Sequence, residues 1–349
     1  MKLIGILLAF VGGGLQGAFF FPMKFMKRWK WENGWFLFIL FACFVLPLTL
    51  ALSTTPDLWG LYESIGISTI TLVLIFGMLW GVGAVLFGLG ADYLGMALGI
   101  AIITGINVVL GALLPVLFLP SGQLSTTSFL LLGGALLLMI TGVVIVSMAG
   151  GRREKEQQVT ETGSAEEAAS GTPGKRVSFR LGLIISIAAG IFVPAANFAV
   201  FFGQPIAEQA QLAGVAPYHL GHAQMLPFFL GGGLVNLLYC IHLFRKNGSF
   251  ALFRGERQLR NTGLGIIMAV LYTFGMLIYV VANAVYIPDI GAVIGWPVFL
   301  AATILVSNLL GILSGEWRGV RSRTFAWLYS GILLLMAAVV LSSLSSLYS

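Results

Sequence analysis

Amide and aromatic side chains lie inside the long apolar stretches of this sequence, where polar groups are costly. Such groups suit a ligand with many hydroxyls, because a hydroxyl that leaves water without a new hydrogen-bond partner loses about 1 to 3 kcal/mol. The CH-rich face of a sugar ring also packs well on an aromatic plane. The structural alternative is that the amides hold helices together and the aromatics anchor helix ends at the membrane surface. The side chains concerned are Gln16, Asn107, Asn197, Gln224, Asn236, Asn283, Asn308, Trp80, Trp296, Tyr272 and Tyr279.

The middle of these apolar stretches contains no charged side chain. A charge near the centre of a bilayer costs at least about 2.5 to 3.5 kcal/mol, so an ion pathway would be marked by one. Its absence favours an uncharged substrate. The sequence also lacks the spacing of a nucleophile with its base, or of a metal-binding cluster, so we expect neither an enzyme nor a bound metal or cofactor. Cys43 and Cys240 have no metal-ligand spacing and are expected to be small core residues.

Coupling of transport to protons would need a titratable group, and the sequence offers four candidates. Asp92 lies in a predicted hairpin, Asp289 and Glu208 lie on the opposite side, and His222 lies near the outer mouth of the seventh stretch. Histidine changes its charge most readily near neutral pH. Each candidate has a structural alternative: Asp92 could cap a helix, Glu208 could lie on a solvated loop, and His222 could be a satisfied polar side chain.

The composition as a whole requires lipid as the solvent. The chain has 349 residues, of which 58% are hydrophobic and 9% charged, with a mean hydropathy of +0.97, whereas a water-soluble chain has about a quarter of its residues charged. About 20 apolar residues cross a bilayer as a helix. The first stretch runs into Pro22 and Lys24 instead of a small-residue cleavage site, so it is a span and not a signal peptide. Ten stretches qualify, at 3–22, 36–52, 70–90, 94–118, 129–148, 181–202, 220–244, 263–284, 291–313 and 325–347.

Lysine and arginine gather in the loops that follow four of the odd-numbered spans. All but Lys2 of the 19 basic residues follow the first, fifth, seventh or ninth span. Since cytoplasmic loops carry the positive excess, we predict that both termini lie on the outer face. This topology explains the net charge of +6, and we expect the lipid bilayer, not a nucleic acid, as the macromolecular environment.

Residues 150–180 change abruptly to Glu, Thr, Ser, Gly and Lys, which cannot bury enough apolar surface to fold. We interpret this segment as a cytoplasmic linker between two halves, 1–149 and 181–349, with five spans each. An odd number of spans per half gives the halves opposite orientations, as in an inverted repeat. The glycine-spaced stretches 95–99 and 291–295, each after a predicted hairpin, are weakly similar. The sequence therefore predicts an all-α integral membrane protein of ten transmembrane helices in two inverted five-helix repeats.

The stretch Phe21–Trp35, FPMKFMKRWKWENGW, resembles the end of the first span and the first cytoplasmic loop of the L-rhamnose:proton symporter family, in the drug/metabolite transporter superfamily. The resemblance covers nearly the whole chain. It continues at Trp80-Gly81, Gly83, Tyr93–Met96, Gly99, Asn197, Pro205, Glu208, Gly214-Val215, Gly231–Gly233, Asn236, Trp296 and Glu316-Trp317.

The resemblance implies the drug/metabolite transporter fold, sugar uptake driven by a proton gradient, and a bacterial inner membrane. The chain departs from the family pattern where Ala84 and Leu86 replace polar amides, Gln204 replaces a basic residue and Ala292 replaces a carboxylate. These changes remove polar groups from positions where a sugar or a proton could be handled.

We predict a sugar:proton symporter for L-rhamnose or a related deoxy or aldose sugar. The alternatives are transport of another small neutral metabolite on the same scaffold, and a membrane sensor or scaffold protein that transports nothing. The predicted substrate contacts are Gln16, Trp80, Asn197, Gln204, Asn236 and Trp296, and the predicted proton-coupling candidates are Asp289, Glu208, Asp92 and His222.

Overall fold

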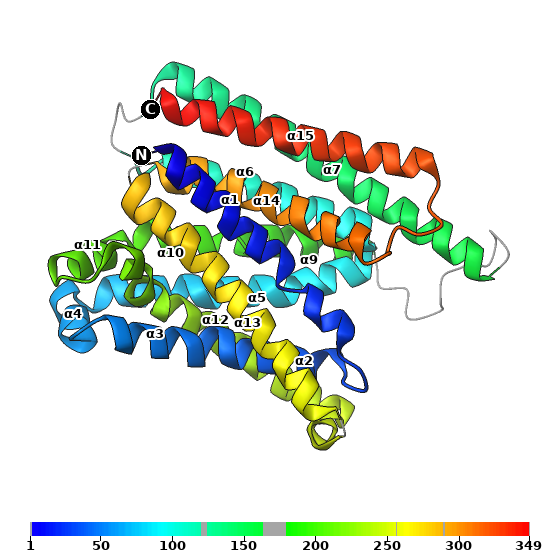
Figure 1. The fold of residues 1–349 in the computed structure, drawn as a ribbon, viewed down its shortest axis with the longest axis horizontal. Coiled ribbons are helices and arrows are strands. Elements are labelled where there is room, and N and C mark those ends of the chain that lie inside the picture. The colour runs from blue at the N-terminus through cyan, green and yellow to red at the C-terminus, as the bar shows by residue number, and fades with distance from the viewer. Residues whose placement is uncertain (1, 120–123, 163–178, 256, 289, 349) are drawn as a thin grey trace.

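The computed structural model describes residues 2–119, 124–162, 179–255, 257–288 and 290–348 of the chain. Every regular element within these residues is helical (Figure 1). This part of the chain contains ten segments that are long and apolar enough to cross a membrane. The predicted all-α class and the predicted number of spans are therefore confirmed.

Five spans precede residue 163, and a short helix, α4 (Leu58–Ile65), connects the second to the third. The spans are formed by α1 (Lys2–Ala18) with the 3-10 helix η1 (Phe21–Phe25), by α2 (Trp31–Ile39) with the π-helix η2 (Leu40–Val45) and α3 (Leu46–Thr54), by α5 (Ile67–Leu94), by α6 (Met96–Val116) and by α7 (Thr126–Thr162).

Five further spans follow residue 178, and the 3-10 helix η4 (Ser249–Arg254) connects the second of them to the third. The spans are formed by α9 (Phe179–Phe192) with α10 (Ala195–Phe202) and α11 (Gln204–Leu212), by the 3-10 helix η3 (Pro217–His219) with α12 (Leu220–Asn247), by α13 (Gln258–Val281) with the π-helix η5 (Ala282–Tyr286), by α14 (Gly291–Leu313) and by α15 (Ser322–Leu347).

Two spans change their helical geometry next to a proline. The ring of Pro47 would clash with the carbonyl of Cys43, four residues earlier, in a regular α-helix. The wider π-turn of η2 lies at this point and accommodates it. Pro194 lies between α9, which ends at Phe192, and α10, which begins at Ala195. This second break fixes where α10 begins, and α10 carries Asn197.

Glycines allow the central helices to approach one another backbone to backbone. A Cβ added at Gly12 would lie 2.6 Å from the carbonyl oxygen of Gly275 in α13, and one added at Gly275 would lie 2.8 Å from that of Gly12. Farther along α1, a Cβ at Gly13 or Gly17 would overlap a backbone carbonyl of α14. Small residues are the usual means by which membrane helices pack closely. We call this contact of α1 with α13 and α14 the glycine seam.

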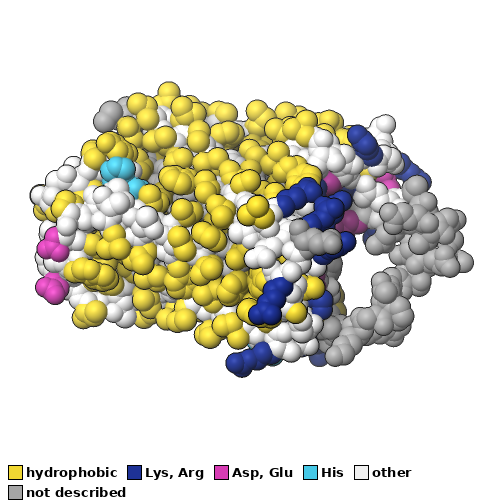
Figure 2. All heavy atoms as spheres, turned by 60° about the horizontal axis from the view of Figure 1, so that its bottom comes forward, with side chains coloured by type: hydrophobic (Ala, Val, Ile, Leu, Met, Phe, Trp, Pro, Cys, Tyr) yellow, Lys and Arg dark blue, Asp and Glu magenta, His cyan; other side chains and the backbone are white. Residues whose placement is uncertain are grey.

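The two chain termini lie at the same end of the molecule (Figure 1). We call this the terminal end, and the opposite end the basic end, because the Lys and Arg side chains gather there (Figure 2). Apolar side chains cover the face between the two ends, as lipid contact requires (Figure 2). Helices α7 and α15 pack along each other as an outer layer (Figure 1). Near the terminal end Ser128 and Ser345 join them, with 2.8 Å between their Oγ atoms.

At the basic end, α5 and α6 are joined by Gly95 alone. Its φ of +83° is a backbone conformation that favours glycine. Helix α7 also reaches far into this end, because its 37 residues continue to Thr162, through the first part of the predicted linker 150–180. The middle of that linker, 163–178, lies outside the described residues, so the division into two domains stays a prediction.

Candidate functional site

Asn197 joins four helices at a buried point nearer the terminal end. Its side chain is fully buried, and its Nδ2 donates to the carbonyl oxygens of Gly111 in α6 and Ala292 in α14, both at 2.7 Å. The hydroxyl of Tyr279 in α13 donates to its Oδ1 at 2.6 Å. Both donor hydrogens and the acceptor of the amide are thus used within the protein. We call Asn197 with these three partners the Asn197 cluster.

Trp296 lies beside the Asn197 cluster with an unused hydrogen-bond donor. Its ring stacks on Phe299 with 5.4 Å between centroids and 13° between planes, and it lies 5.6 Å from the ring of Tyr279. The indole is 3% exposed, and its Nε1 has no hydrogen-bond partner among the described residues. A Cβ at position 111 would overlap this nitrogen, so glycine there makes the room that the indole occupies.

Five buried amide oxygens also lack a hydrogen-bond partner in the described part of the chain, those of Gln224, Asn261 and three further residues. Asn107 lies one helical turn before Gly111 on α6, and its Oδ1 is unpaired. Asn283 lies one turn after Tyr279; its Nδ2 donates to the Tyr279 carbonyl oxygen at 2.7 Å, while its Oδ1 is unpaired. On α1, the Oε1 of Gln16 is in the same state. Buried polar atoms are usually paired, so each of these oxygens can accept a hydrogen bond from a bound ligand or from a water.

Trp80 and Asn236 form a second group, nearer the middle of α5 and α12. The ring of Trp80 packs 5.5 Å from Phe228 and 5.6 Å from Tyr272, over Gly232, where a Cβ would come within 2.6 Å of the ring. Asn236 is fully buried and accepts from Trp35 Nε1 at 3.0 Å. Its Nδ2 donates to the carbonyl oxygen of Gly232 in α12 at 2.9 Å and to that of Gly81 in α5 at 3.4 Å, beside the ring of Trp80.

The predicted substrate contacts therefore do not all lie together. Asn197 and Trp296 lie in one group, and Trp80 and Asn236 lie in another. Gln204 is half-buried at the terminal end, where its Nε2 donates to the Pro288 carbonyl oxygen at 2.5 Å. Asn197 and Asn236 are occupied as helix-joining amides, whereas Trp296 and Gln16 have free polar atoms. Asn107 and Asn283 also have a free polar atom, although the sequence did not predict them as substrate contacts. Their place in apolar runs marked them as polar interior residues, but so it did for the amides that join helices.

The four proton-coupling candidates lie in different surroundings. Asp92 and Glu208 are exposed, at the basic and terminal ends respectively, and Asp289 lies outside the described residues. His222 is buried, with 7% of its surface exposed. Its Nδ1 lies 2.9 Å from the hydroxyl of Thr54 in α3.

The contacts of the Thr54 hydroxyl favour one tautomer of His222. The hydroxyl can donate its one hydrogen to the Leu50 carbonyl oxygen at 2.7 Å. It then accepts from Nδ1 of His222, which leaves Nε2 as the acceptor of a neutral imidazole. The neighbouring ring of His219 lies 4.8 Å from it, centroid to centroid.

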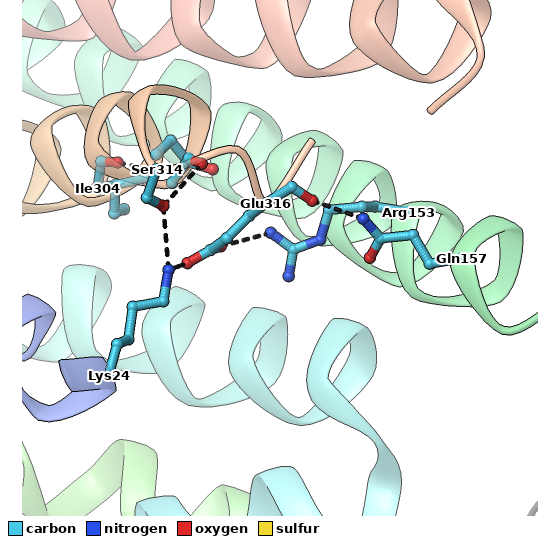
Figure 3. A network of polar contacts seen from close by, with 8 residues as sticks. Lys24, Arg153, Gln157, Ile304, Ser314 and Glu316 are labelled. Carbon is cyan, nitrogen blue, oxygen red and sulfur yellow. Dashed lines mark hydrogen bonds and ion pairs between the residues drawn. The ribbon is translucent and has the colours of Figure 1, made fainter. Parts of the chain in front are cut away.

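At the basic end, Glu316 connects three segments that are far apart in the sequence (Figure 3). Its carboxylate pairs with Lys24 of η1 through Oε1 and with Arg153 of α7 through Oε2, the latter at 2.8 Å. Its carbonyl oxygen accepts from Gln157 Nε2 at 2.7 Å, and Lys24 Nζ also donates to Ser314 Oγ at 3.1 Å. Sequence reasoning did not select these residues as a site. The signal available in the sequence was the pair Glu316-Trp317, a carboxylate beside a tryptophan in the loop between two predicted spans.

The loop after the first span docks on the segment between α12 and α13. The carboxylate of Glu32 accepts from Ser249 Oγ at 2.5 Å and from Asn247 Nδ2 at 2.9 Å. Asn33 Nδ2 donates to the Ser249 carbonyl oxygen at 2.9 Å, and Trp29 Nε1 donates to that of Leu252 at 3.0 Å. The polar residues of the 21–35 stretch thus hold segments of the two predicted halves together at the basic end.

A groove of about 360 Å³ lies between α6 and α7, and its lining is almost entirely apolar. Val109 and Leu113 of α6 face Phe129, Gly133 and Leu136 of α7 across it. It offers no polar side chain to a hydroxyl and is therefore not the candidate substrate site. The unpaired polar atoms of Trp296, Asn107, Asn283 and Gln16 do not line it.

Ten apolar spans around uncharged, partly unpaired polar groups are the arrangement of a multi-pass membrane transporter. The comparisons with known proteins agree with this class. A family model described as L-rhamnose-proton symport protein (RhaT) matches residues 1–346, and the chain belongs to that family of transporters. The family name describes proton-coupled transport and no enzymatic reaction.

Curated relatives match over nearly their full length. The L-rhamnose-proton symporter of Pectobacterium atrosepticum is 28% identical over 350 residues, which cover 96% of each chain. That of Citrobacter koseri is 28% identical over 342 residues, covering 96% of this chain and 95% of the relative. That of Salmonella typhimurium is 27% identical over 341 residues with the same coverage. The resemblance predicted from the 21–35 stretch is therefore confirmed.

Proposed function

We propose that this protein carries a small, neutral, hydroxyl-rich metabolite, such as L-rhamnose or a related deoxy or aldose sugar, across the bacterial inner membrane together with protons. The observation that carries the proposal is a set of unpaired buried polar atoms, three of which belong to residues one helical turn from a member of the Asn197 cluster. Trp296 supplies one donor, and Gln16, Asn107 and Asn283 supply acceptors. A ligand with several hydroxyl donors is the natural complement of a site rich in acceptors.

The substrate contacts follow from which groups are free. Trp296 and Gln16 are direct contacts, with Asn107 and Asn283 as further acceptors. Trp80 lies in the second group, where its ring face can pack on the apolar side of a sugar ring that passes it. Asn197 and Asn236 hold the helices that carry these contacts, and they reach the substrate only if their present hydrogen bonds open. Gln204 acts at the entrance on the terminal end.

The helix contacts support an arrangement as two inverted five-helix repeats of the drug/metabolite transporter fold, 1–149 and 181–349, joined by a linker. The packing of α1 on α14 has a counterpart in α9 on α6, and that of α1 on α13 in α9 on α5. Likewise α5 on α12 corresponds to α13 on the second span, while α7 and α15 pack on each other. The Lys and Arg loops favour a cytoplasmic basic end and periplasmic termini.

His222 is the proton-coupling candidate with the best support among the described residues. It is buried, it lies near the terminal end where protons enter a symporter of this orientation, and its Nε2 can accept a proton without breaking the bond to Thr54. Its surroundings include the ring of His219, and Tyr62 of α4 donates to the carbonyl oxygen of the next residue, Ala223. Glu208, Asp92 and Asp289 are the other candidates.

Uptake by reconstituted vesicles tests substrate and coupling separately. Labelled L-rhamnose should accumulate only in vesicles that contain the protein, and an inward proton gradient should increase its uptake severalfold. Competition by other sugars at millimolar excess gives the substrate class. If no sugar competes or accumulates, another neutral metabolite or a non-transporting sensor or scaffold becomes the better interpretation.

A variant at His222 tests the coupling group. In His222→Asn the amide Nδ2 can still donate to Thr54, but the side chain no longer takes up a proton. Uptake should then become independent of the imposed gradient while remaining above that of protein-free vesicles. Glu208→Gln is the matched control at the same end. If Glu208→Gln removes the gradient dependence and His222→Asn keeps it, the assignment to His222 is wrong.

A further inference from the structure

Glu316 holds the end of the first span and the extension of α7 to the loop between α14 and α15. Lys24 comes from η1, Arg153 and Gln157 come from α7, and Glu316 with Ser314 comes from the loop after α14 (Figure 3). These contacts connect elements of the two predicted halves. We call Lys24, Arg153 and Glu316 the basic-end latch.

The latch begins where the glycine seam ends. From the terminal end to Gly17, α1 lies against α14 and α13 with no space for a Cβ at its contact glycines. Helix α1 then stops at Ala18, and toward the basic end the side chain of Lys24 makes the polar contact to the α14–α15 loop. A backbone seam cannot open without separating whole helices, whereas a contact between long side chains can open by rotation of those side chains.

Water has access to all three members of the latch. The side chains of Lys24, Glu316 and Arg153 are 40%, 31% and 20% exposed. When the pairs separate, water can solvate the freed charges, so the exposed pairs are inexpensive to break and re-form. A contact with this property suits a step that must occur in every transport cycle, because the closed and open states must be close in free energy.

We propose that Glu316 is the gating residue of the basic end. Its pairs with Lys24 and Arg153 keep the end of the first span and the α7 extension against the α14–α15 loop while this end is closed. The pairs separate when it opens. The proposal rests on the proposed transport function for its purpose, but the opening itself is a property of the protein without substrate.

Distances between spin labels measure that opening directly. Lys27 and Arg323 are exposed residues on the two sides of the latch and serve as labelling positions after replacement by cysteine, in a chain where Cys43 and Cys240 are changed to alanine. The test variant is Glu316→Gln, which removes the charge and keeps the size. The matched control is Arg152→Gln, because Arg152 is the neighbour of Arg153 but lies 4.0 Å over the Trp327 ring instead of in the latch.

With Glu316 present, one short distance should predominate at low salt, and in Glu316→Gln at least half of the population should move to a longer distance. Raising the salt concentration should lengthen the distance in the parent protein and change little in Glu316→Gln, a response that a purely structural residue would not produce. Arg152→Gln should behave like the parent. Identical distance distributions for parent and Glu316→Gln, or no response to salt, would overturn the latch.

Uptake measured on the same proteins separates this proposal from the transport function. A salt-dependent shift in distance without uptake of any sugar would retain the latch and remove the proposed substrate class. Uptake that is unchanged in Glu316→Gln, with unchanged distances, would retain the transporter and remove the gate.

Discussion

The helices near the two ends of the molecule are held together by contacts of different kinds. Toward the terminal end, the Asn197 cluster joins four helices through neutral hydrogen bonds on a fully buried side chain. At the basic end, the latch joins loops and a helix extension through charged, partly exposed side chains. Removing one partner of a buried hydrogen bond costs about 1 to 3 kcal/mol, whereas an exposed ion pair contributes about 0.2 to 1 kcal/mol. The basic end should therefore open first from the conformation described here.

The largest effect is expected where a helix contact leaves no room at all. Gly13→Ala would place a methyl group against the Phe299 carbonyl oxygen and force α1 away from α14. Overpacking of this kind costs about 1 to 3 kcal/mol or more, so we expect strongly reduced folded protein. Gly14→Ala is the control, since its added Cβ would meet Val306 Cγ2 at an ordinary 3.4 Å. Yield of monodisperse protein and its thermal unfolding in detergent measure both; equal behaviour of the two variants would contradict the seam.

The next largest effect concerns the Asn197 cluster. Asn197→Ala leaves Tyr279, Gly111 and Ala292 without a buried partner, and we expect a loss of about 2 kcal/mol of stability, with uptake reduced about tenfold or more. Asn308→Ala is the control, because among the described residues the Nδ2 of Asn308 bonds within its own helix, to the Ile304 carbonyl oxygen at 2.8 Å. Thermal unfolding and uptake should both separate the two variants. A stable, fully active Asn197→Ala protein would show that the terminal end is not held by this amide.

A smaller effect should appear mainly in substrate affinity. Trp296→Phe keeps a stacked ring and removes a donor that no described residue uses. The smaller ring should lower stability by about 1 kcal/mol, while KM for the transported sugar rises about fivefold to tenfold, the value of one hydrogen bond of about 1 to 1.4 kcal/mol. Trp35→Phe makes the same change in ring size and also breaks the bond to Asn236, so it should lower stability further and leave KM unchanged. An unchanged KM in Trp296→Phe would remove Trp296 from the substrate site.

The smallest effect is expected for one arm of the latch. Arg153→Gln leaves Glu316 paired with Lys24, so we expect a change in stability of less than about 1 kcal/mol. The rate of uptake should change about twofold and become less dependent on salt. Arg152→Gln should keep the salt dependence of the parent. If the two arginine variants respond alike to salt between low and physiological concentrations, Arg153 has no part in gating.

Hydropathy alone predicted all ten spans, because the need to bury about 20 apolar residues per crossing leaves little freedom. The family was also readable, since the 21–35 stretch is long and specific. The sequence did not predict which buried amides use all their hydrogen-bonding groups within the protein and which leave one free. Asn197 and Asn107 are both amides in apolar runs, yet one uses all its hydrogen-bonding groups and the other leaves its oxygen free. That difference depends on where Pro194 ends α9 and on which carbonyls then face α10.

The latch was beyond the reach of sequence reasoning for a related reason. Lys24 and Glu316 lie in different loops at opposite ends of the chain, and a loop residue at the basic end has many oppositely charged neighbours to choose from. Only the packing of α1 on α14 and of α7 on α15 brings this pair and Arg153 together. The topology therefore determines that Lys24, Arg153 and Glu316 lie at the same end of the molecule, and the tertiary packing determines which of them pair.

The length of α7 couples the latch to the thickness of the bilayer. Its apolar part, residues 126–149, is about 36 Å long at about 1.5 Å per residue, which exceeds a hydrocarbon core of about 30 Å. A span that is longer than the core adapts to a thinner membrane by tilting, and tilting swings the polar turns that follow it, which bear Arg153, sideways relative to the α14–α15 loop. Lipids with shorter acyl chains should thus pull on the latch mechanically, and identical uptake rates in thin and thick vesicles would show that α7 transmits no such force.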